Sequence, residues 1–453
     1  MRRDRLGLLA VLLLAMLTLS GCNGVPKLIF DPQDLYSLPT LPAQYTELNK
    51  QLTAVLDSGA EFSAPTSGTN IQTVQLVDLD GDGQSEAVAF FRDPTAEKPL
   101  KIYVFTARDG SYEQTDLIEG SGSSIYSIHY EDLDGDGRKE LAVGWKATEG
   151  QQVLEVYTLR PTGAEVLVRT NYVKYITADL DQDQRQELVV LRADDEGEGI
   201  ADYYSWQEDG SFTSQSSARI SVTMAEVSQQ GRVTEGTLRE NAPAIFVTGV
   251  TDVPRTVTDI LAVRNGKLSN IVLSELTGVS SEIALYCPLY PADINGDGLT
   301  EVPWPTQLFS PFDDGTVYQQ IDWRTYDSSG AAETADRTYH ALEDGWYFRL
   351  PEAWNGQLYV GRTVLGDEAT VTFYIRREER EPEAFLKITA ITGASREVKA
   401  ARGGRFVLGR RQPGTIYTAE LLETGSGWDC GLTADQVRAA FSLIPTEWIA
   451  GDT

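Results

Sequence analysis

The chain has few of the residues on which most enzyme and zinc chemistry depends. Its 453 residues include three cysteines and two histidines, His129 and His340. So few cysteines exclude a disulfide framework, and the sequence has no CxxC or HExxH zinc motif, no GxSxG elbow and no P-loop. His129 stands in the alternating run SIYSIHYED, so we predict a strand residue there rather than a catalytic base.

Positive charge is also scarce. The sequence has 38 Lys and Arg against 67 Asp and Glu, a formal net charge of −29. Such a chain repels nucleic acid and anionic lipid, so we expect no nucleic-acid partner and no membrane binding through a basic face.

The abundant acidic residues are arranged in a repeated motif. Four nonapeptides share one pattern, which we call loops one to four: DLDGDGQSE (78–86), DLDGDGRKE (132–140), DLDQDQRQE (179–187) and DINGDGLTE (293–301). Each carries oxygen side chains at positions 1, 3, 5 and 9. Calcium prefers six to eight oxygen ligands around a tight turn, so the spacing predicts three to four Ca²⁺ sites. Four bound ions would bring the formal charge to about −21.

The predicted ligands are the side chains at positions 1, 3, 5 and 9 and the backbone carbonyl at position 7. They are Asp78, Asp80, Asp82, Gln84 and Glu86; Asp132, Asp134, Asp136, Arg138 and Glu140; Asp179, Asp181, Asp183, Arg185 and Glu187; and Asp293, Asn295, Asp297, Leu299 and Glu301.

The nonapeptides have two alternative interpretations besides a calcium loop of this kind. An EF-hand needs an acidic ligand at position 12, but the residues there are Ala89, Val143, Val190 and Trp304, and apolar strand-like runs follow each loop. The loops could also be acidic surface turns without metal, since Asp and Gly dominate turns. For loop three both readings stay open, because Gln182 and Gln184 replace the turn glycines and a non-glycine residue in a left-handed turn costs about 1–2 kcal/mol.

The loops mark out a repeating unit. Turn signals follow the first three loops at Asp109-Gly110, Thr162-Gly163 and Asp209-Gly210, between β-type runs. One module reads as loop, strand, strand, turn, strand, strand. A degenerate copy is predicted over AEVSQQGRVTEG, with Glu226, Ser228, Gln230 and Gly231 at positions 1, 3, 5 and 6 and Thr234 at position 9. Its turn is Asn265-Gly266, and the last module has its turn at Ser329-Gly330.

Five four-stranded modules predict a mainly β fold, a β-propeller with five to seven blades over residues 60–340. The DxDGDGxxE loop that leads into an apolar strand resembles the FG-GAP/VCBS repeats of integrin-type β-propellers. The resemblance implies a propeller with Ca²⁺ in the blade loops, and the chain departs from it at Gln182, Gln184 and the degenerate copy.

The N-terminus has the features of an export signal. Basic residues precede an apolar run, Leu6 to Leu19, and the run ends in LSGC, which resembles a bacterial lipobox. The resemblance implies a signal peptide over 1–21 and lipidation of Cys22, hence a lipid anchor outside the cytoplasm. A membrane-spanning anchor is the alternative. Residues 22–59 read as the lipidated cysteine, a spacer and a short helix.

After residue 340 the repeats stop, and residues 341–453 predict a separate α+β domain. Its strands and final helix, with a capping box at Thr433 and Gln436, faintly resemble PsbP-like domains. Cys287 and Cys430 could pair or remain buried thiols. Trp346, Trp354 and Trp428 could be core residues or part of a carbohydrate site, and tryptophan is more often a core residue.

These features favour a non-enzymatic function. We expect a cell-surface lipoprotein with a calcium-stabilised propeller that binds an extracellular protein or glycan. The alternative is an extracellular polysaccharide- or ester-degrading enzyme with structural calcium, because paired carboxylates across a cleft leave no sequence pattern.

Overall fold

The computed structural model describes residues 45–108, 111–147, 151–274, 276–312, 316–376, 381–411, 414–425, 430–445 and 448. The predictions for the signal peptide, Cys22, Asp109-Gly110 and Trp428 fall outside these ranges. Within them the protein is mainly β, as predicted, and none of their helices has the length and apolar character of a membrane span.

The first three blades are antiparallel sheets in which strands follow chain order. Blade one consists of β2 (Val74–Val77), β3 (Glu86–Arg92), β4 (Leu100–Arg108) and β5 (Ser111–Gly120), and β1 (Glu61–Phe62) pairs with the end of β3. Blade two consists of β6 (Ser124–Glu131), β7 (Glu140–Lys146), β8 (Gln152–Arg160) and β9 (Gly163–Tyr172). Blade three consists of β10 (Lys174–Ala178), β11 (Glu187–Ala193), β12 (Gly199–Trp206) and β13 (Phe212–Arg219).

Two further blades complete the predicted count of five. Blade four consists of β14 (Arg232–Thr237), β15 (Pro243–Val250), β16 (Arg255–Arg264) and β17 (Lys267–Asn270), and β18 (Ile283–Leu285) pairs with β16. Blade five consists of β19 (Val302–Leu308), β20 (Tyr318–Tyr326), β21 (Ala332–Ala341), β22 (Trp346–Arg349) and β28 (Phe441–Leu443). The predicted turns that the structure describes lie between paired strands, and at Asn265-Gly266 both residues have the positive φ of a type I′ hairpin turn.

The second strand of a blade is buried on both faces by the neighbouring blades. In β11, Leu188 and Val190 join the core shared with blade two, while Val189 and Leu191 join the core shared with blade four. Successive side chains of a strand point to opposite faces, so a strand between two sheets must be apolar at every position. This explains the unbroken apolar runs that follow the loops.

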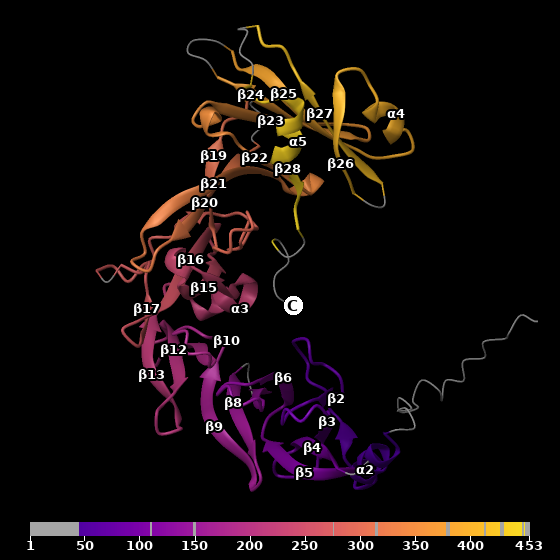
Figure 1. Ribbon diagram of the computed structural model, residues 1–453, viewed down its shortest axis with the longest axis vertical. Coiled ribbons are helices and arrows are strands. Elements are labelled where there is room, and N and C mark those ends of the chain that lie inside the picture. Colours follow the sequence, from indigo (N-terminus) through magenta and orange to yellow (C-terminus); the bar gives the residue numbers. More distant parts are fainter. Residues whose placement is uncertain are drawn as a thin grey trace, which may run out of the picture.

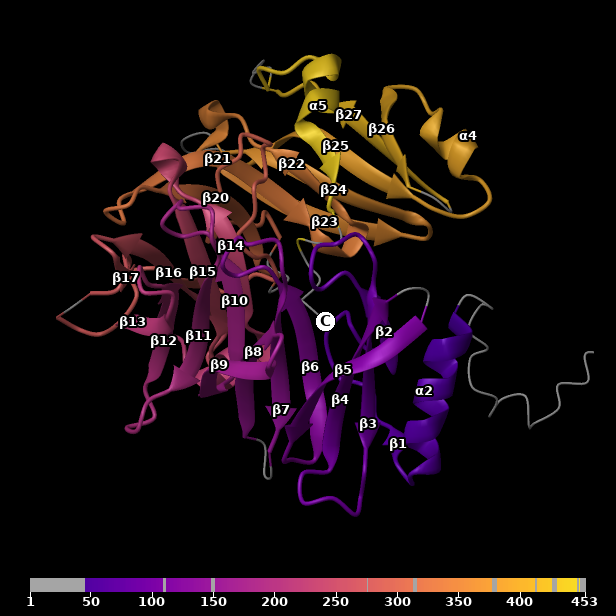
Figure 2. The same cartoon turned by 60° about the horizontal axis from the view of Figure 1, so that its bottom comes forward.

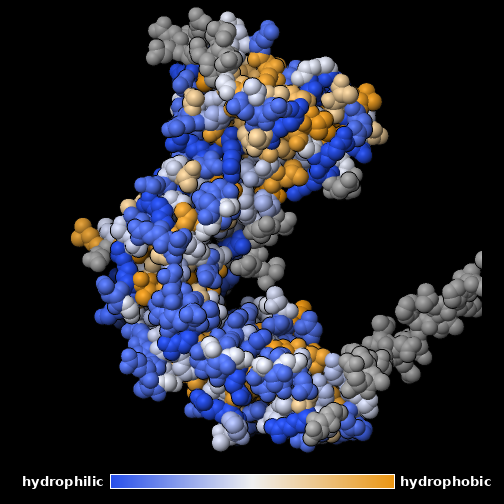
Figure 3. All heavy atoms as spheres, in the orientation of Figure 1, coloured by the Kyte–Doolittle hydropathy of each residue, from blue (hydrophilic) through white to orange (hydrophobic). Residues whose placement is uncertain are grey.

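The blades are arranged in an arc that remains open on one side (Figures 1 and 3). At its first end, helix α2 (Thr46–Asp57) lies against blade one (Figure 2) and takes the place of a preceding blade. Its Leu48 and Leu52 pack with Phe91 and Phe105, and full burial of a leucine contributes about 1.5–3 kcal/mol. The predicted short helix therefore closes the core of blade one.

At the other end of the arc, a second sheet covers one face of blade five. This sheet contains β23 (Leu358–Leu365), β24 (Glu368–Ile375), β25 (Glu383–Ile391), β27 (Thr415–Leu421) and β26 (Arg405–Arg411), in that spatial order. Short helices in the described chain include α3 (Met224–Gln230), α4 (Arg396–Ala400), α5 (Ala434–Ala440) and the 3-10 turns Arg239–Asn241, Leu342–Asp344 and Glu352–Trp354. The capping box at Thr433 and Gln436 is present at the start of α5.

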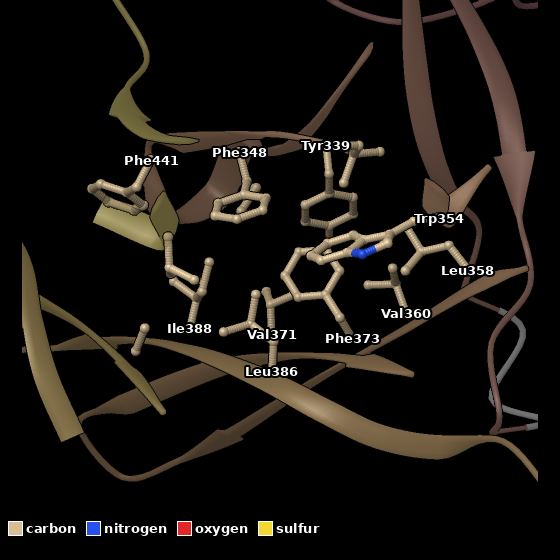
Figure 4. Packing of buried hydrophobic residues seen from close by; sticks show 14 of the residues in the cluster. Tyr339, Phe348, Trp354, Leu358, Val360, Val371, Phe373, Leu386, Ile388 and Phe441 are labelled. Atoms are coloured by element: carbon tan, nitrogen blue, oxygen red, sulfur yellow. The ribbon is translucent and has the colours of Figure 1, made fainter. Parts of the chain in front are cut away.

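One hydrophobic core joins blade five to this C-terminal sheet (Figure 4). Tyr339 of β21 and Phe348 of β22 face Phe373 of β24, with ring centroids 5.3 and 5.8 Å apart. Trp346 and Trp354 are fully buried in this core, which decides between the two readings: they are core residues. Cys287 and Cys430 are both buried, lie in different clusters and form no disulfide.

The predicted order of strands within a module is wrong by one strand. β6, for example, pairs with β7 of blade two, whereas the sequence assigned it to the preceding module. The physical reason is that each nine-residue loop is the connection of a hairpin, so the strands on its two sides pair with each other.

The predicted degenerate loop at Glu226 is also wrong. Residues Met224–Gln230 form helix α3, because Thr223 and Glu226 make a reciprocal capping box at its start. The connection that corresponds to a loop in blade four is the short segment 238–242 between β14 and β15. This segment contains the fully buried Leu238 but does not contain the nonapeptide sequence.

Candidate metal centres

Each predicted loop connects the first and second strands of a blade and begins and ends at paired residues. In the first three blades the last residue of the first strand pairs with the position-9 Glu: Val77 with Glu86, Glu131 with Glu140 and Ala178 with Glu187. In blade five the first strand is reduced to one bridge, Ala292 with Glu301. All four loops therefore lie at equivalent places in their blades.

The four loops share one backbone conformation. Positions 4 and 6 have positive φ throughout, between 65° and 87°, in every copy. Loop three adopts this conformation with Gln182 at φ 65° and Gln184 at φ 73°. The strain that the sequence predicted for this loop is therefore present.

The position-1 Asp organises the turn through backbone amides. Its two carboxylate oxygens accept hydrogen bonds from two amides inside the loop, and in loop two these come from Gly135 (2.8 Å) and Gly137 (2.9 Å). The position-5 Asp accepts from the position-7 N–H, which in loop two is Arg138 at 2.8 Å. The turn thus holds the carboxylates at positions 1 and 5 in place before any ion binds.

The position-9 Glu is the buried member of each set. Glu86, Glu140, Glu187 and Glu301 are at most 4% exposed. One oxygen of each accepts the position-2 N–H at 2.8–3.0 Å, from Leu79, Leu133, Leu180 and Ile294. Burial raises the pKa of Glu140, Glu187 and Glu301 to about 7 and also raises the pKa of Glu86.

These oxygens fit a hard cation. In loops one and three, oxygens from positions 1, 3 and 9 lie within 4.8 Å of one another, and in loop two oxygens from positions 1, 3 and 5 do so. A buried carboxylate beside other carboxylates is costly unless a cation neutralises it. In each of loops one to three, three of the four predicted side-chain ligands are therefore close enough to hold one cation, such as Ca²⁺. The fourth side chain, the position-7 carbonyl and the set in loop four stay predictions.

Loop three has a competitor for its ion. Arg185 donates to Asp183 from Nε at 2.9 Å, and this contact lowers the pKa of the Asp183 carboxyl. A guanidinium already neutralises one of the four predicted ligands, in addition to the strain at Gln182 and Gln184. We expect loop three to bind calcium more weakly than loops one and two.

Loop four contains an internal donor. Asn295 Nδ2 donates to Asp297 at 3.0 Å and to Glu301 at 3.1 Å, so the amide group lies between two carboxylates. Binding a cation at this loop would require the amide oxygen to turn inward, because an amide nitrogen does not ligate Ca²⁺.

The loops of neighbouring blades are hydrogen-bonded to one another, a feature that the sequence did not predict. The position-8 N–H of each later loop donates to a carbonyl of the preceding blade: Lys139 to Leu79 (2.8 Å), Gln186 to Leu133 (3.1 Å) and Thr300 to Thr237 (2.8 Å). Leu79 and Leu133 thus bond their own position-9 Glu through N–H and the next loop through C=O. We call this series of contacts the loop ladder.

The ladder is tightest between loops one and two. A Cβ placed on Gly81 would lie 2.5 Å from the carbonyl oxygen of Gly137, so only glycine fits there. At Gly296, the same position of loop four, a Cβ would meet nothing within 4 Å. The recurrence of the loop from one module to the next was the sequence signal that pointed to adjacent loops.

Comparison with known proteins identifies the repeat. The FG-GAP-like repeat family matches residues 78–143, from the start of loop one to the strand after loop two. No match was found among curated proteins. A protein of known crystal structure from Lactobacillus plantarum is 10% identical, with 80% of this chain and 95% of that chain covered and a TM-score of 0.21. Residues 78–143 are thus similar to an FG-GAP-like repeat. The four- and five-stranded antiparallel sheets of the structure independently have the form of β-propeller blades.

Proposed function

We propose that this protein is a calcium-stabilised, non-enzymatic binding module, held outside the cytoplasm by a lipid on Cys22. Its ligand would be an extracellular protein or glycan. The anchor and the location rest on the N-terminal sequence, and the calcium on the loops.

The observation that carries the proposal is the shared geometry of the position-9 glutamates. Four buried carboxylates, each fixed by one backbone N–H, lie in acidic loops between the first two strands of their blades. In the described part of the chain, the groups of three carboxylates close enough to share an ion belong to loops one to three. Calcium there would stabilise hairpins inside the blades, and stability of a scaffold is what a binding surface requires.

Calcium titration tests this proposal. Each site that binds only the folded chain adds about 2.7 kcal/mol when free calcium is 100 times its Kd. We therefore expect the melting temperature to rise with millimolar Ca²⁺ and to fall in chelator. An unchanged melting temperature in chelator would show that the loops are metal-free turns.

Two matched variants separate the loops. Asp80→Ala removes a ligand from an unstrained loop, and Asp181→Ala removes the equivalent ligand from loop three. We expect Asp80→Ala to abolish more of the calcium-induced rise, because loop three is strained and its Asp183 is already paired with Arg185. Equal losses would contradict the weaker affinity of loop three.

A further inference from the structure

One corner of the C-terminal sheet, where the β23–β24 hairpin meets α4, exposes apolar side chains to solvent. Leu365, at the tip of the hairpin, is 83% exposed, and Val398 of α4 is 75% exposed. The two elements are held together by the ion pair between Lys399 and Asp367. On the other side of α4, Ala400 is buried against the sheet. The helix is therefore fixed with Val398 outward, beside the hairpin tip.

Positive charge is concentrated at the same corner. Residues 393–411 contain one acidic residue, Glu397, and six basic residues: Arg396, Lys399, Arg402, Arg405, Arg410 and Arg411. Asp367, Glu368 and Glu420 of the adjoining sheet lie beside them. Six basic against four acidic residues leave a surplus of two positive charges, in a chain of formal charge −29. We call residues 364–368 and 393–411 the basic corner.

The basic side chains of this corner have two different environments. Lys399 and Arg405 are largely buried and neutralise Glu368, at 3.7 and 2.7 Å. Arg402 and Arg410 remain more than half exposed, although each is paired with a carboxylate. Exposed ion pairs contribute little to stability, so these two guanidinium groups can exchange their partners for another anion at small cost. A guanidinium binds a phosphate through two parallel hydrogen bonds.

Apolar side chains beside exposed arginines match the surface of an anionic membrane. Such a surface accepts apolar side chains at the boundary of its acyl chains and binds cations through its headgroup phosphates. A nucleic acid or an acidic peptide would pair with the arginines but leave Leu365 and Val398 in water. The negative charge elsewhere on the chain acts weakly here, because exposed charges more than about 8 Å away are screened at physiological salt. The expectation drawn from the net charge therefore does not apply to this corner.

The basic corner also lies on the side of the protein that the proposed anchor would bring to a membrane. Helices α2 and α4 are at opposite ends of the arc, and both lie at its open side (Figures 1 and 2). Residues 23–44, which would join Cys22 to α2, span at most about 75 Å when fully extended. A lipid on Cys22 would thus leave the open side of the arc within reach of the membrane.

We propose that the basic corner binds an anionic membrane surface, with Leu365 and Val398 inserted between headgroups and Arg402 and Arg410 bound to phosphates. The orientation rests on the proposed lipid anchor, whereas the binding itself does not. Two contacts, one at each end of the arc, would hold the protein against the membrane in a fixed orientation, which a single lipid does not.

Vesicle flotation tests this contact without the anchor. The mature chain from residue 22 onward carries Cys22→Ser, so that no lipid is attached. It is mixed with vesicles of equal parts phosphatidylglycerol and phosphatidylcholine, or of phosphatidylcholine alone. Chelator is present, because calcium bridges acidic proteins to anionic lipid, and the temperature is below the melting point in chelator. We expect at least about fivefold tighter binding to the anionic vesicles, falling as salt is raised.

A matched pair of arginine variants tests the role of charge. Arg410→Gln should weaken vesicle binding about fivefold, the usual contribution of one basic residue at a membrane surface. Arg160→Gln is the control, because Arg160 is exposed to a similar extent and is likewise paired with a glutamate, Glu165, but lies on blade two. It should leave binding unchanged.

A matched pair of leucine variants tests insertion. Leu365→Ser should weaken binding about tenfold, since part of the free energy of burying a leucine is lost. Leu276→Ser is the control, because Leu276 is 94% exposed and lies between β17 and β18, outside the basic corner. All four side chains are exposed, so each variant should melt within a few degrees of the parent, and melting confirms that it is folded.

Several results would overturn the inference. These are no binding to the anionic vesicles, equal binding to both kinds of vesicle, or equal weakening by a variant and its control. Binding that appears only with calcium would assign the contact to the acidic loops, and tighter binding of duplex DNA or polyglutamate would replace the membrane with a soluble polyanion. Lipidation of Cys22 is measured separately, by the mass of the protein extracted from bacterial membranes, so failure of the corner and failure of the anchor are distinguishable.

Discussion

Loop two and loop four carry nearly the same nonapeptide in different surroundings. Loop two lies between two other loops and is hydrogen-bonded to both, through Lys139 on one side and Leu133 on the other. Loop four lies beside blade four, where the short connection 238–242 has no nonapeptide, and it contacts that blade through Thr300. A similar motif can therefore be one of a connected series or a separate site, depending on its neighbours.

This comparison leads to a difference in coupling. In the ladder, one residue joins the position-9 Glu of a loop, through its N–H, to the backbone of the next loop, through its C=O. An ion that fixes Glu140 also fixes Leu133, whose carbonyl holds Gln186 beside Glu187. Occupation of one loop should favour occupation of its neighbours in blades one to three, and loop four should fill independently.

The largest expected effect comes from removing one ligand in each region. Asp134→Ala should remove the loop-two site and also weaken loops one and three, so its loss of calcium-dependent stability exceeds the roughly 2.7 kcal/mol of a single site at 100 times Kd. Asp297→Ala should remove the calcium site of loop four and leave the affinities of the other sites unchanged. Calorimetric calcium titration gives the number and affinity of the remaining sites, and independent losses in both variants would disprove the coupling.

A smaller effect is expected from a pair of glycine substitutions. Gly81→Ala and Gly296→Ala impose the same left-handed strain on their own loops, about 1–2 kcal/mol. Only the Cβ at position 81 also meets the carbonyl of Gly137 in the next loop. Calcium titration should show two weakened sites in Gly81→Ala and one in Gly296→Ala. If both variants weaken a single site, the contact between loops one and two does not transmit binding.

The smallest difference between the two regions is expected in the pH dependence of stability in chelator, which should be equal in both. The folded chain raises the pKa of Glu140 and Glu301 from 4.5 to about 7, so it keeps protons that the unfolded chain releases between these values. The contribution of these two groups to the free energy of unfolding without calcium should therefore be greatest below pH 4.5. It should fall as the pH rises to 7.

Thermal melting between pH 5 and pH 8 measures this fall. Glu140→Gln and Glu301→Gln should each flatten the curve by a similar amount, because burial is the main cause of both shifts. In saturating calcium the carboxylates are ionised and neutralised by the ion, so the fall should disappear. A wild-type curve that falls equally with and without calcium would contradict this assignment.

The local features could be predicted from the sequence because they depend on short-range chemistry. The ligand spacing, the apolar second strands, the Asn265-Gly266 hairpin and the strain at Gln182 and Gln184 all follow from residue type and position. The module count also followed, since loops and turn signals recur along the chain.

The features that depend on pairing over long distances could not be predicted. The polar residues from Glu226 onward have the spacing of a loop, but Glu226 forms a capping box with Thr223 and the segment is a helix. The hydrogen bond from Lys139 to Leu79 joins residues 60 positions apart through backbone atoms, which leave no trace in side-chain chemistry. The shared core of blade five and the C-terminal sheet likewise depends on which faces meet.

Helix α2 and the C-terminal sheet have a consequence for how this protein can change in evolution. A closed ring fixes its number of blades, because every blade must subtend the same fraction of a full turn. Here the first blade is covered by a helix and the last by a sheet, so neither end needs the other to bury its apolar face. Gain or loss of one whole blade in the middle would lengthen or shorten the arc and leave both terminal cores intact.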